Sequence, residues 1–561
     1  METNLKREES LKMWKSLRFG LFVHWGIYAV PAQGEWYMYN SKVPVKEYEK
    51  YAAQFNPKDY DPEKWVLMAK DAGMKYIVFT TKHHDGFSMF KTDVDSFNVV
   101  DATPYGKDTL KELADACRKH DMKLGLYYSH VREWRHPLAQ SYEPKSGRPD
   151  LIGNYGNFWD YPDEGKKDLQ RYIDEFDKPQ LKELLTNYGD ILTIWFDTAS
   201  HINDRQAIEL RDWVYSHQET CLINGRLCGN KELVDYLSMG DNAISAFPEE
   251  KAWESAMTFG YGWGYFRDPN YEDYTVVLKK FVEIIAKGGN LLLNVGPDEN
   301  GVVPEKAQQE LKKIGQWIRK NEDAIYDVEP LRLPYLCDWG YTAKKGNKIY
   351  LYITDSNFEK VGLTGIKTKV VSCKVLENNK VCEFNQNEDE IGITIGKGAN
   401  DEVRIIEIEC DGDIVVENKI IPNYEGNVYL TGQNGTLNIN YPYSKMTATN
   451  MHIRHWLHSE DTITWNFSTK DSGTYSLEVV IAGGGYMKQE DVGHEIFAVV
   501  DGKSYEIPFP KDAVPDSKRR ILIINDVNIE KGEHELVLKP KKISSECNLG
   551  LKFQYIKLNK E

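Results

Sequence analysis

The stretch "KYIVFTTKHH", residues 75–84, has an apolar centre and ends in two histidines that precede Asp85. Short, continuously apolar runs are typical of parallel strands that are covered on both faces. The first 330 residues contain seven further strand candidates, which are "FGLFVHWG" (19–26), "KLGLYYSH" (123–130), "DILTIWFD" (190–197), "TCLINGR" (220–226), "DYLSMGD" (235–241), "SAMTFGYGWG" (255–264) and "GNLLLNVGP" (289–297).

Amphipathic helical patterns lie between these runs. In "PEKWVLMAKDAG" the apolar residues Trp65, Met68, Ala69 and Ala72 follow helical spacing up to Gly73. Similar patterns occupy residues 107–122, 166–188, 205–217, 273–287 and 304–321. Eight strands alternating with helices predict an α/β fold, a (β/α)₈ TIM-like barrel over residues 1–330. No strand is followed by G-x-G-x-x-G and no G-x-x-x-x-G-K occurs, which argues against nucleotide cofactors.

The character of the chain changes after residue 330. Short alternating strands separated by turn residues predict a small β-sandwich over residues 331–412. A second all-β stretch, residues 413–561, predicts another sandwich, and its segments "NMHIRHWLHSEDTITWNF" and "DSGTYSLEVVIAGGG" loosely resemble carbohydrate-binding modules. We therefore expect two all-β sandwich domains that follow the barrel along the chain.

Composition restricts the partners and the compartment. The 561 residues carry a formal net charge of −16, which argues against nucleic acid or an anionic membrane as the main partner. No run approaches 18 apolar residues, so no membrane span is expected. The first 20 residues lack the apolar segment of a secretory signal, and the eight cysteines are scattered without a C-x-x-C. We expect a cytoplasmic protein with free thiols.

Reactive side chains gather where the predicted strands end. In a barrel the carboxyl ends of the strands hold the active site. These ends and the loops that follow them supply histidines, aromatic rings, an arginine and carboxylates, namely His24, Trp25, Glu35, Trp36, His83, His84, Asp85, Tyr127, Tyr128, His130, Trp195, Asp197, Arg226, Asp241, Glu254 and Trp263.

Three chemistries compete for this set. A metal site is not favoured, because adjacent His83 and His84 are expected to point to opposite sides of a strand and no H-E-x-x-H occurs. A serine or cysteine nucleophile would need an elbow such as G-x-S-x-G, which is missing. Two carboxylates around a sugar fit better, one ionised at the anomeric carbon and one protonated beside the leaving oxygen. We expect no cofactor.

Six ordered motifs resemble the α-L-fucosidases of glycoside hydrolase family 29. They are "RFGLFVHWGIYAVPAQGEWY", "KYIVFTTKHHDGFSMF", "LGLYYS", "IWFD", "WESAMTFGYGWGY" and "GGNLLLNVGP". The resemblance covers residues 10–330 and extends loosely to about 412. It implies a retaining enzyme that releases terminal α-L-fucose from fucosylated glycans, with Asp197 as nucleophile. It also implies sugar contacts from His24, Trp36, His83, His84, Tyr127, Trp195 and Arg226. From the strand ends alone, Glu35 and Trp263 are further candidates for contacts with the sugar.

The acid/base is open, because the family varies at this position. The residue before Asp241 is Gly240, so the glutamate that some members carry there is missing. We favour Asp241, with Glu254 as the alternative and Glu249 or Glu250 behind it. Two other functions use the same pocket: a transfucosylase, and a catalytically inactive fucose-binding protein.

The segment "HIRHWLHSED" in the last domain is dense in groups that suit sugars, with His452, His455, Trp456 and His458. We expect it near a barrel mouth, of its own chain or of a neighbour in a homo-oligomer, with Trp456 as a contact for the leaving sugar. The alternative is a domain that only packs.

Overall fold

The computed structural model describes residues 2–139, 155–199, 202–398, 401–449, 452–482, 492–510, 519–544 and 550–561. The chain forms two compact units. The first comprises Met1–Ile244 and Glu249–Val328, and the second comprises Ser245–Pro248 and Glu329–Glu561.

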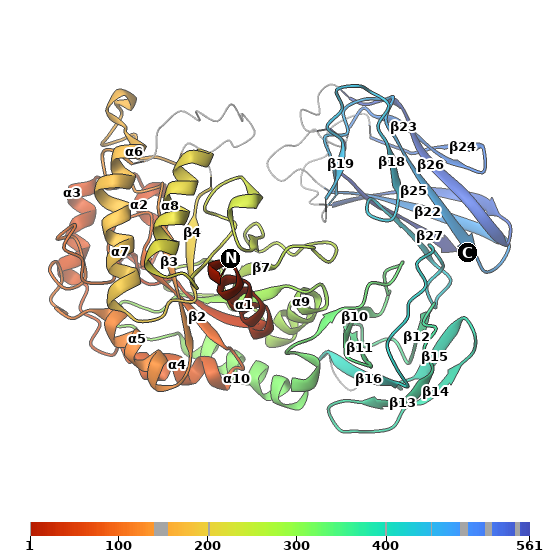
Figure 1. Ribbon diagram of the computed structural model, residues 1–561, viewed down its shortest axis with the longest axis horizontal. Coiled ribbons are helices and arrows are strands. Elements are labelled where there is room, and N and C mark those ends of the chain that lie inside the picture. Colours follow the sequence, from red (N-terminus) through yellow and green to blue (C-terminus); the bar gives the residue numbers. More distant parts are fainter. Residues whose placement is uncertain are drawn as a thin grey trace. The chain divides into compact units, whose positions relative to one another are not determined.

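The first unit is built on eight parallel strands (Figure 1). Their order is β5-β4-β3-β2-β1-β8-β7-β6, and a parallel bridge between Asn224 and Tyr236 joins the two remaining edges. The predicted TIM-like barrel is therefore confirmed. The strands are β1 (Phe19–Val23), β2 (Tyr76–Lys82), β3 (Lys123–Ser129), β4 (Thr193–Asp197), β5 (Leu222–Ile223), β6 (Leu237–Ser238), β7 (Trp253–Thr258) and β8 (Asn290–Val295).

Helices cover the outside of these strands, as Figure 1 shows for α4, α5, α7 and α8. Carboxylate or amide side chains cap several of them, as Asp61 does for α4 and Asn203 for α8. Between β5 and β7 the one helical element of the described chain is a short 3₁₀ turn, Lys231–Leu233, so the helical layer is incomplete there. The main helices are α4 (Pro62–Asp71), α5 (Thr109–Lys119), α6 (Leu169–Tyr172), α7 (Lys178–Asn187), α8 (Asp204–His217), α9 (Tyr274–Ala286) and α10 (Glu305–Lys320).

The connection between β1 and β2 is long and mostly helical. It holds two 3₁₀ helices, Ile27–Ala29 and Glu49–Gln54, and the short helices α2 (Tyr37–Asn40) and α3 (Val45–Tyr48). This connection supplies Trp36 and Tyr48 to the carboxyl ends of the strands.

The interior of the barrel is filled by large side chains. Phe22, Val78, Tyr127, Trp195 and Leu292 belong to one buried cluster. Helix α1 (Glu2–Leu17) closes the amino-terminal end: its Trp14 stacks on Tyr236 at 4.1 Å between ring centroids, and its backbone oxygen accepts from Asn290. Side chains thus fill the barrel interior and its amino-terminal end, and space remains at the carboxyl ends of the strands.

A close helix crossing gives a first testable prediction. A Cβ at Gly315 of α10 would lie 1.8 Å from the backbone oxygen of Asp71, the last residue of α4. Because neither helix can retreat without opening the barrel wall, we expect Gly315→Ala to lower the free energy of unfolding by about 1–3 kcal/mol. Gly229→Ala is the control, since no atom lies within 4 Å of its added Cβ. Equal urea midpoints for both variants would contradict the assignment of this packing.

The second unit contains two β-sandwiches. In the first, sheet β13-β16-β11-β10-β9 faces sheet β12-β15-β14, and residues such as Leu351, Ile406, Val361 and Ile393 share one core. Its strands are β9 (Glu329–Pro330), β10 (Gly340–Lys345), β11 (Lys348–Ile353), β12 (Lys360–Thr364), β13 (Val370–Val375), β14 (Glu383–Gln386), β15 (Glu390–Thr394) and β16 (Arg404–Cys410).

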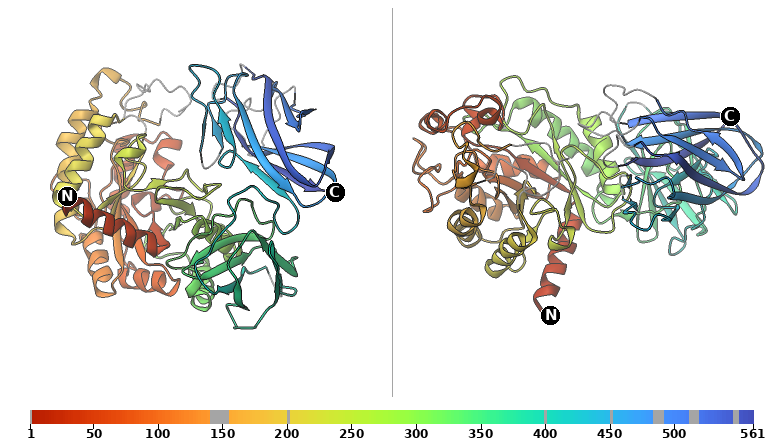
Figure 2. Two further views of the ribbon diagram at one scale, coloured as in Figure 1. Left: turned by 45° about the vertical axis from the view of Figure 1, so that its right-hand side comes forward. Right: turned by 90° about the horizontal axis from the view of Figure 1, so that it is seen from above.

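The second sandwich pairs sheet β17-β27-β22-β25 with sheet β18-β21-β26-β23-β24, which lie as two layers in Figure 2. Its strands alternate buried and exposed residues around a separate core. They are β17 (Val428–Thr431), β18 (Thr436–Asn438), β21 (Thr462–Thr469), β22 (Gly473–Ala482), β23 (Glu495–Val500), β24 (Lys503–Glu506), β25 (Arg519–Ile529), β26 (Gly532–Lys542) and β27 (Phe553–Lys560), with the small ribbon β19 (Thr447–Ala448) and β20 (Ile453–Arg454) beside them. Within the described ranges no helix is long and apolar enough to span a membrane.

Candidate active site

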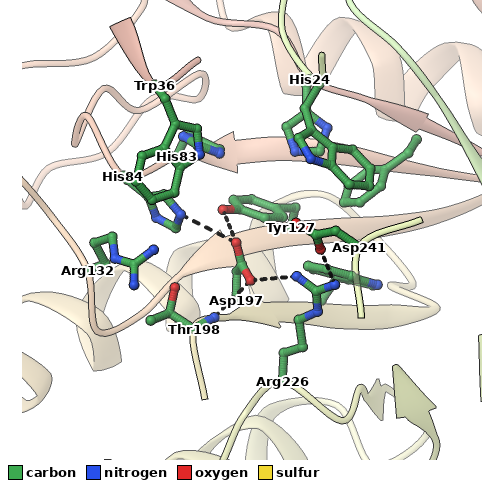
Figure 3. A pocket seen from close by; sticks show the side chains of 13 residues that line it. His24, Trp36, His83, His84, Tyr127, Arg132, Asp197, Thr198, Arg226 and Asp241 are labelled. Atoms are coloured by element: carbon green, nitrogen blue, oxygen red, sulfur yellow. Dashed lines mark hydrogen bonds and ion pairs between the residues drawn. The ribbon is translucent and has the colours of Figure 1, made fainter. Parts of the chain in front are cut away.

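A pocket of about 210 Å³ lies at the carboxyl ends of the barrel strands (Figure 3). Its floor is polar and its walls are largely aromatic. The residues that line it are Phe22, His24, Trp36, His83, His84, Tyr127, Arg132, Trp195, Asp197, Thr198, Arg226, Asp241 and Trp263. Most of the residues predicted from strand ends are therefore brought together in one place.

Asp197, the last residue of β4, lies at the centre of the pocket floor. Its Oδ2 accepts from the Tyr127 hydroxyl at 2.9 Å, and its Oδ1 accepts from the Thr198 backbone N–H at 2.8 Å and from Arg226 Nη1 at 3.2 Å. His84 Nε2 is 3.4 Å from Oδ2. Thr198, whose N–H makes this contact, has a φ of 75°, an unusual backbone conformation for a β-branched residue.

These contacts keep Asp197 ionised. Burial alone would raise its pKa, but the hydrogen bond from His84 and the positive charges of Arg226 and Arg132 together hold the pKa of this carboxyl well below its usual range. A largely buried carboxylate that stays charged and has four polar neighbours is suited to act as a nucleophile or as an electrostatic stabiliser.

Three neutral histidines stand around this carboxylate. Burial lowers the pKa of His24 to about 3 and that of His84 to about 4, and it lowers the pKa of His83 well below its ordinary value. Nδ1 of His83 is buried and has no hydrogen-bond partner among the described residues.

The expectation that adjacent His83 and His84 point to opposite sides was wrong. Strand β2 ends at Lys82, and its register with β3 is already irregular between Thr80 and Lys82. Both histidines follow the strand, so the alternation of side chains does not apply to them and both line the pocket. No group of three or more His, Cys, Asp or Glu suited to a metal ion occurs within the described part of the chain.

The walls are aromatic and tightly supported. The rings of Tyr127 and Trp195 stack at 5.6 Å, Tyr127 also stacks on His83 at 5.3 Å, and Phe22 packs on Trp195 at 5.0 Å. Such a wall offers apolar ring faces next to hydrogen-bonding groups, which is the pattern that binds a sugar with one apolar face.

A second carboxylate, Asp241, lies on the other arm of Arg226. Arg226 Nη2 donates to its Oδ1 while Nη1 of the same guanidinium contacts Asp197 (Figure 3). The two carboxylates therefore share one cation and both line the pocket. The Asp241 side chain is 54% exposed, which leaves it open to a ligand that enters from solvent.

Glu254, the alternative acid/base, lies beneath the pocket floor and does not line it. Its carboxyl accepts from the Tyr76 hydroxyl at 2.7 Å and from Trp195 Nε1 at 2.9 Å. Burial raises its pKa to about 7. This carboxyl supports the indole of Trp195 from below. Glu249 and Glu250 are also absent from the pocket lining.

The raised pKa of Glu254 predicts a pH-dependent stability. Between about pH 4.5 and pH 7 the unfolded chain has lost this proton while the folded chain keeps it, so the free energy of unfolding falls as pH rises through this range. The loss is on the order of 3 kcal/mol for a fully buried group. Glu254→Gln should remove this part of the pH dependence. Urea unfolding of both proteins at pH 5 and pH 8 measures it, and identical changes in both would contradict the prediction.

Two weaker predictions need correction. Glu35 is buried, and its carboxyl accepts from the Gly264 backbone N–H at 2.7 Å, so it holds the loop of Trp263 and does not line the pocket. Trp456 is fully buried in the core of the second sandwich, and its Nε1 donates to the Asp461 backbone oxygen at 3.2 Å. The ring of Trp456 therefore presents no face to a sugar.

Three pocket residues were missed. Arg132 lies three residues past the end of β3, with its guanidinium 5.3 Å from the Trp36 ring, and Thr198 directly follows β4. Extending the search at each strand end by a few loop residues would have found both. Phe22 lies two residues before His24 and on the same side of β1, which the alternation along a strand indicates.

Comparisons with known proteins agree with this geometry. A family model described as alpha-L-fucosidase matches residues 1–323. The tissue alpha-L-fucosidase of Rattus norvegicus is 30% identical over 345 residues, which cover 56% of this chain and 70% of that protein. The alpha-L-fucosidase of Vibrio sp. strain EJY3 superposes with a TM-score of 0.82 at 25% identity and covers 98% of both chains.

A second similar structure shows a reaction intermediate. It is a GH29 alpha-L-fucosidase from Bacteroides thetaiotaomicron, trapped as a covalent intermediate with 2-fluoro-fucosyl fluoride. It is 25% identical with a TM-score of 0.63, and the match covers 72% of this chain and 96% of that one.

Proposed function

Because this chain belongs to the α-L-fucosidase family, glycoside hydrolase family 29, and is a glycoside hydrolase, we propose that it releases terminal α-L-fucose from fucosylated glycans or oligosaccharides with retention of configuration. The observation that carries the proposal is the ionised carboxylate of Asp197, fixed by Tyr127, Thr198 and Arg226 on the floor of an aromatic pocket. The covalent intermediate of the Bacteroides relative supports the same two-step route here.

In the first step Asp197 attacks the anomeric carbon and forms a β-linked fucosyl ester. Asp241 gives a proton to the glycosidic oxygen as the bond to the leaving sugar breaks. In the second step Asp241 takes a proton from water, which attacks the ester from the face that the leaving group occupied. Two displacements, each with inversion, return α-L-fucose.

Arg226 contacts both carboxylates of the pocket, Asp197 and Asp241. Its guanidinium offsets the repulsion between Asp197 and Asp241, and it favours the ionised form of Asp197. Asp241 must carry a proton when it acts as the general acid. We propose that the bound glycoside separates the pair and that the leaving sugar covers Asp241, which is exposed in the free pocket.

The pocket also suits the sugar. L-Fucose carries three ring hydroxyls and an apolar C6 methyl. The neutral side chains of His24, His83 and His84 offer hydrogen bonds to hydroxyls, while the rings of Trp36 and Trp263 offer apolar surface. The second carboxylate in the pocket speaks for hydrolysis and against an inactive fucose-binding protein.

The stereochemistry of the first product tests this proposal. We expect proton NMR of a fresh reaction with 4-nitrophenyl α-L-fucoside to show the α anomer of free fucose first, and the β anomer later by mutarotation. A β anomer as the first product would contradict the two-step route, and no release of fucose would contradict the activity.

A further inference from the structure

Asn294, in strand β8, connects a pocket histidine to the loop that carries Trp263. Its side chain is buried. Its Nδ2 donates to the Trp263 backbone oxygen at 2.6 Å, and its Oδ1 lies 2.7 Å from Nδ1 of His24. His24 and Trp263 themselves lie side by side, with 5.2 Å between ring centroids.

These contacts fix the direction of each hydrogen bond. A backbone carbonyl can only accept, so the amide nitrogen of Asn294 must face Trp263 and its oxygen must face His24. An amide oxygen can only accept, so Nδ1 of His24 must carry the proton. The imidazole is neutral, because burial lowers its pKa to about 3. Nε2 of His24 therefore keeps a lone pair.

We propose that Asn294 is a positioning residue that fixes His24 as a hydrogen-bond acceptor toward the pocket and couples this state to the Trp263 loop. The proposal deepens the proposed function, on which it rests for the identity of the ligand. A neutral histidine held in this form receives the proton of a sugar hydroxyl through Nε2. The other tautomer would present an N–H there and would bind the hydroxyl oxygen instead.

The loop is fixed from both sides. Asn294 holds the carbonyl of Trp263, and the buried carboxyl of Glu35 holds the N–H of the next residue, Gly264. Trp263 lines the pocket together with His24. A change at Asn294 should therefore disturb both the proton on His24 and the position of the indole, whereas a change at Glu35 disturbs the loop alone.

The first test reads the proton directly in the free protein. With ¹⁵N-labelled histidine, and with the His24 signals assigned through their loss in His24→Gln, we expect long-range ¹H–¹⁵N spectra at neutral pH to show Nδ1 protonated and Nε2 bare. Asn294→Leu should shift the population toward the Nε2–H form. Asn294→Asp should keep Nδ1 protonated, because a carboxylate also accepts. A wild-type His24 with the proton on Nε2 would overturn the proposal.

The second test is kinetic. Asn294→Leu should lower kcat/KM for an aryl α-L-fucoside by roughly tenfold or more, as expected when a buried hydrogen-bonding group loses its partner. The matched control is Asn290→Leu, a buried amide four residues earlier in β8 that bonds the backbone of Trp14 at the amino-terminal end of the barrel and does not line the pocket. It should stay within about twofold of the wild type if it folds equally well.

Deoxygenated substrates show whether Asn294→Leu loses the contact between His24 and one sugar hydroxyl or loses activity for a general reason. Among aryl fucosides that lack one hydroxyl each, the one that has lost the partner of His24 should react poorly with the wild type. This penalty should shrink in Asn294→Leu. Unchanged penalties for every hydroxyl would contradict the proposal. If the protein released no fucose at all, the NMR result would still decide the state of His24, so failure of this inference and failure of the proposed function can be distinguished.

Discussion

Replacing Asp197 by alanine is expected to reduce kcat for α-L-fucosides by roughly 10⁴-fold or more, the scale seen when an enzyme loses its nucleophile. The physical reason is that no other group in the pocket can replace the Asp197 carboxylate as nucleophile. Burial keeps His24, His83 and His84 neutral, and Asp241 lies on the opposite arm of Arg226. Steady-state kinetics with 4-nitrophenyl α-L-fucoside measures the loss.

Two further results make this prediction specific. Azide fits the space left by the carboxylate, so it should restore release of an activated leaving group from Asp197→Ala and yield β-L-fucosyl azide. Asp235→Asn is the control: this half-buried carboxylate precedes β6 at the other end of the strands and bonds Tyr215, so its loss should leave turnover near wild type. Turnover of Asp197→Ala near that of the control would exclude Asp197 as nucleophile.

Replacing Asp241 is expected to have the second-largest effect, and the effect should depend on the leaving group. Proton donation by a general acid contributes about 10²–10⁴-fold to the rate, so Asp241→Ala should lose activity on this scale with oligosaccharides. The dinitrophenolate of a dinitrophenyl fucoside can leave without a proton. With this substrate the rate of the first step should be almost unchanged. Azide should now attack the fucosyl ester from the open side and give α-L-fucosyl azide, the opposite anomer to that from Asp197→Ala.

Parallel variants decide between the candidate acids. Glu254→Gln keeps the hydrogen bonds to Tyr76 and Trp195 within reach and removes only the ionisable group, so we expect a modest loss that is equal for all leaving groups. Glu249→Gln and Glu250→Gln should behave like the wild type. A leaving-group dependence in Glu254→Gln that is missing in Asp241→Ala would reverse the assignment of the acid/base.

The sequence predicted the barrel and most of the pocket for one physical reason. Apolar strands that are buried on both faces have a strong signature, and a barrel brings all their carboxyl ends together. Once the strands were located, residues as distant as His24 and Asp241 had to meet at one end. The observed strands β5 and β6 have only two residues each, so the predicted strands were too long. This error did not affect the predicted site, because Arg226 and Asp241 follow the observed strands within a few residues.

What the sequence could not show depends on local backbone paths. Whether His83 and His84 face one side was decided by where β2 ends, and Arg132 reaches the pocket through a loop with no repeating pattern. Trp456 has the composition of a sugar contact, but burial on folding decides between a core residue and a binding residue. The roles of Glu35 and Glu254 as supports likewise follow from partners far away in the chain, Gly264 and Tyr76.

The most direct test of the account is the site of covalent labelling. A 2-fluoro-fucosyl fluoride makes both displacements slow but keeps an excellent leaving group, so the fucosyl-enzyme should accumulate. We predict that mass spectrometry of the inactivated protein shows one 2-fluoro-fucosyl group per chain, and that peptide mapping places it on Asp197. A label on another carboxylate, or inactivation without any covalent label, would contradict the assignment of Asp197 as the nucleophile of a retaining fucosidase.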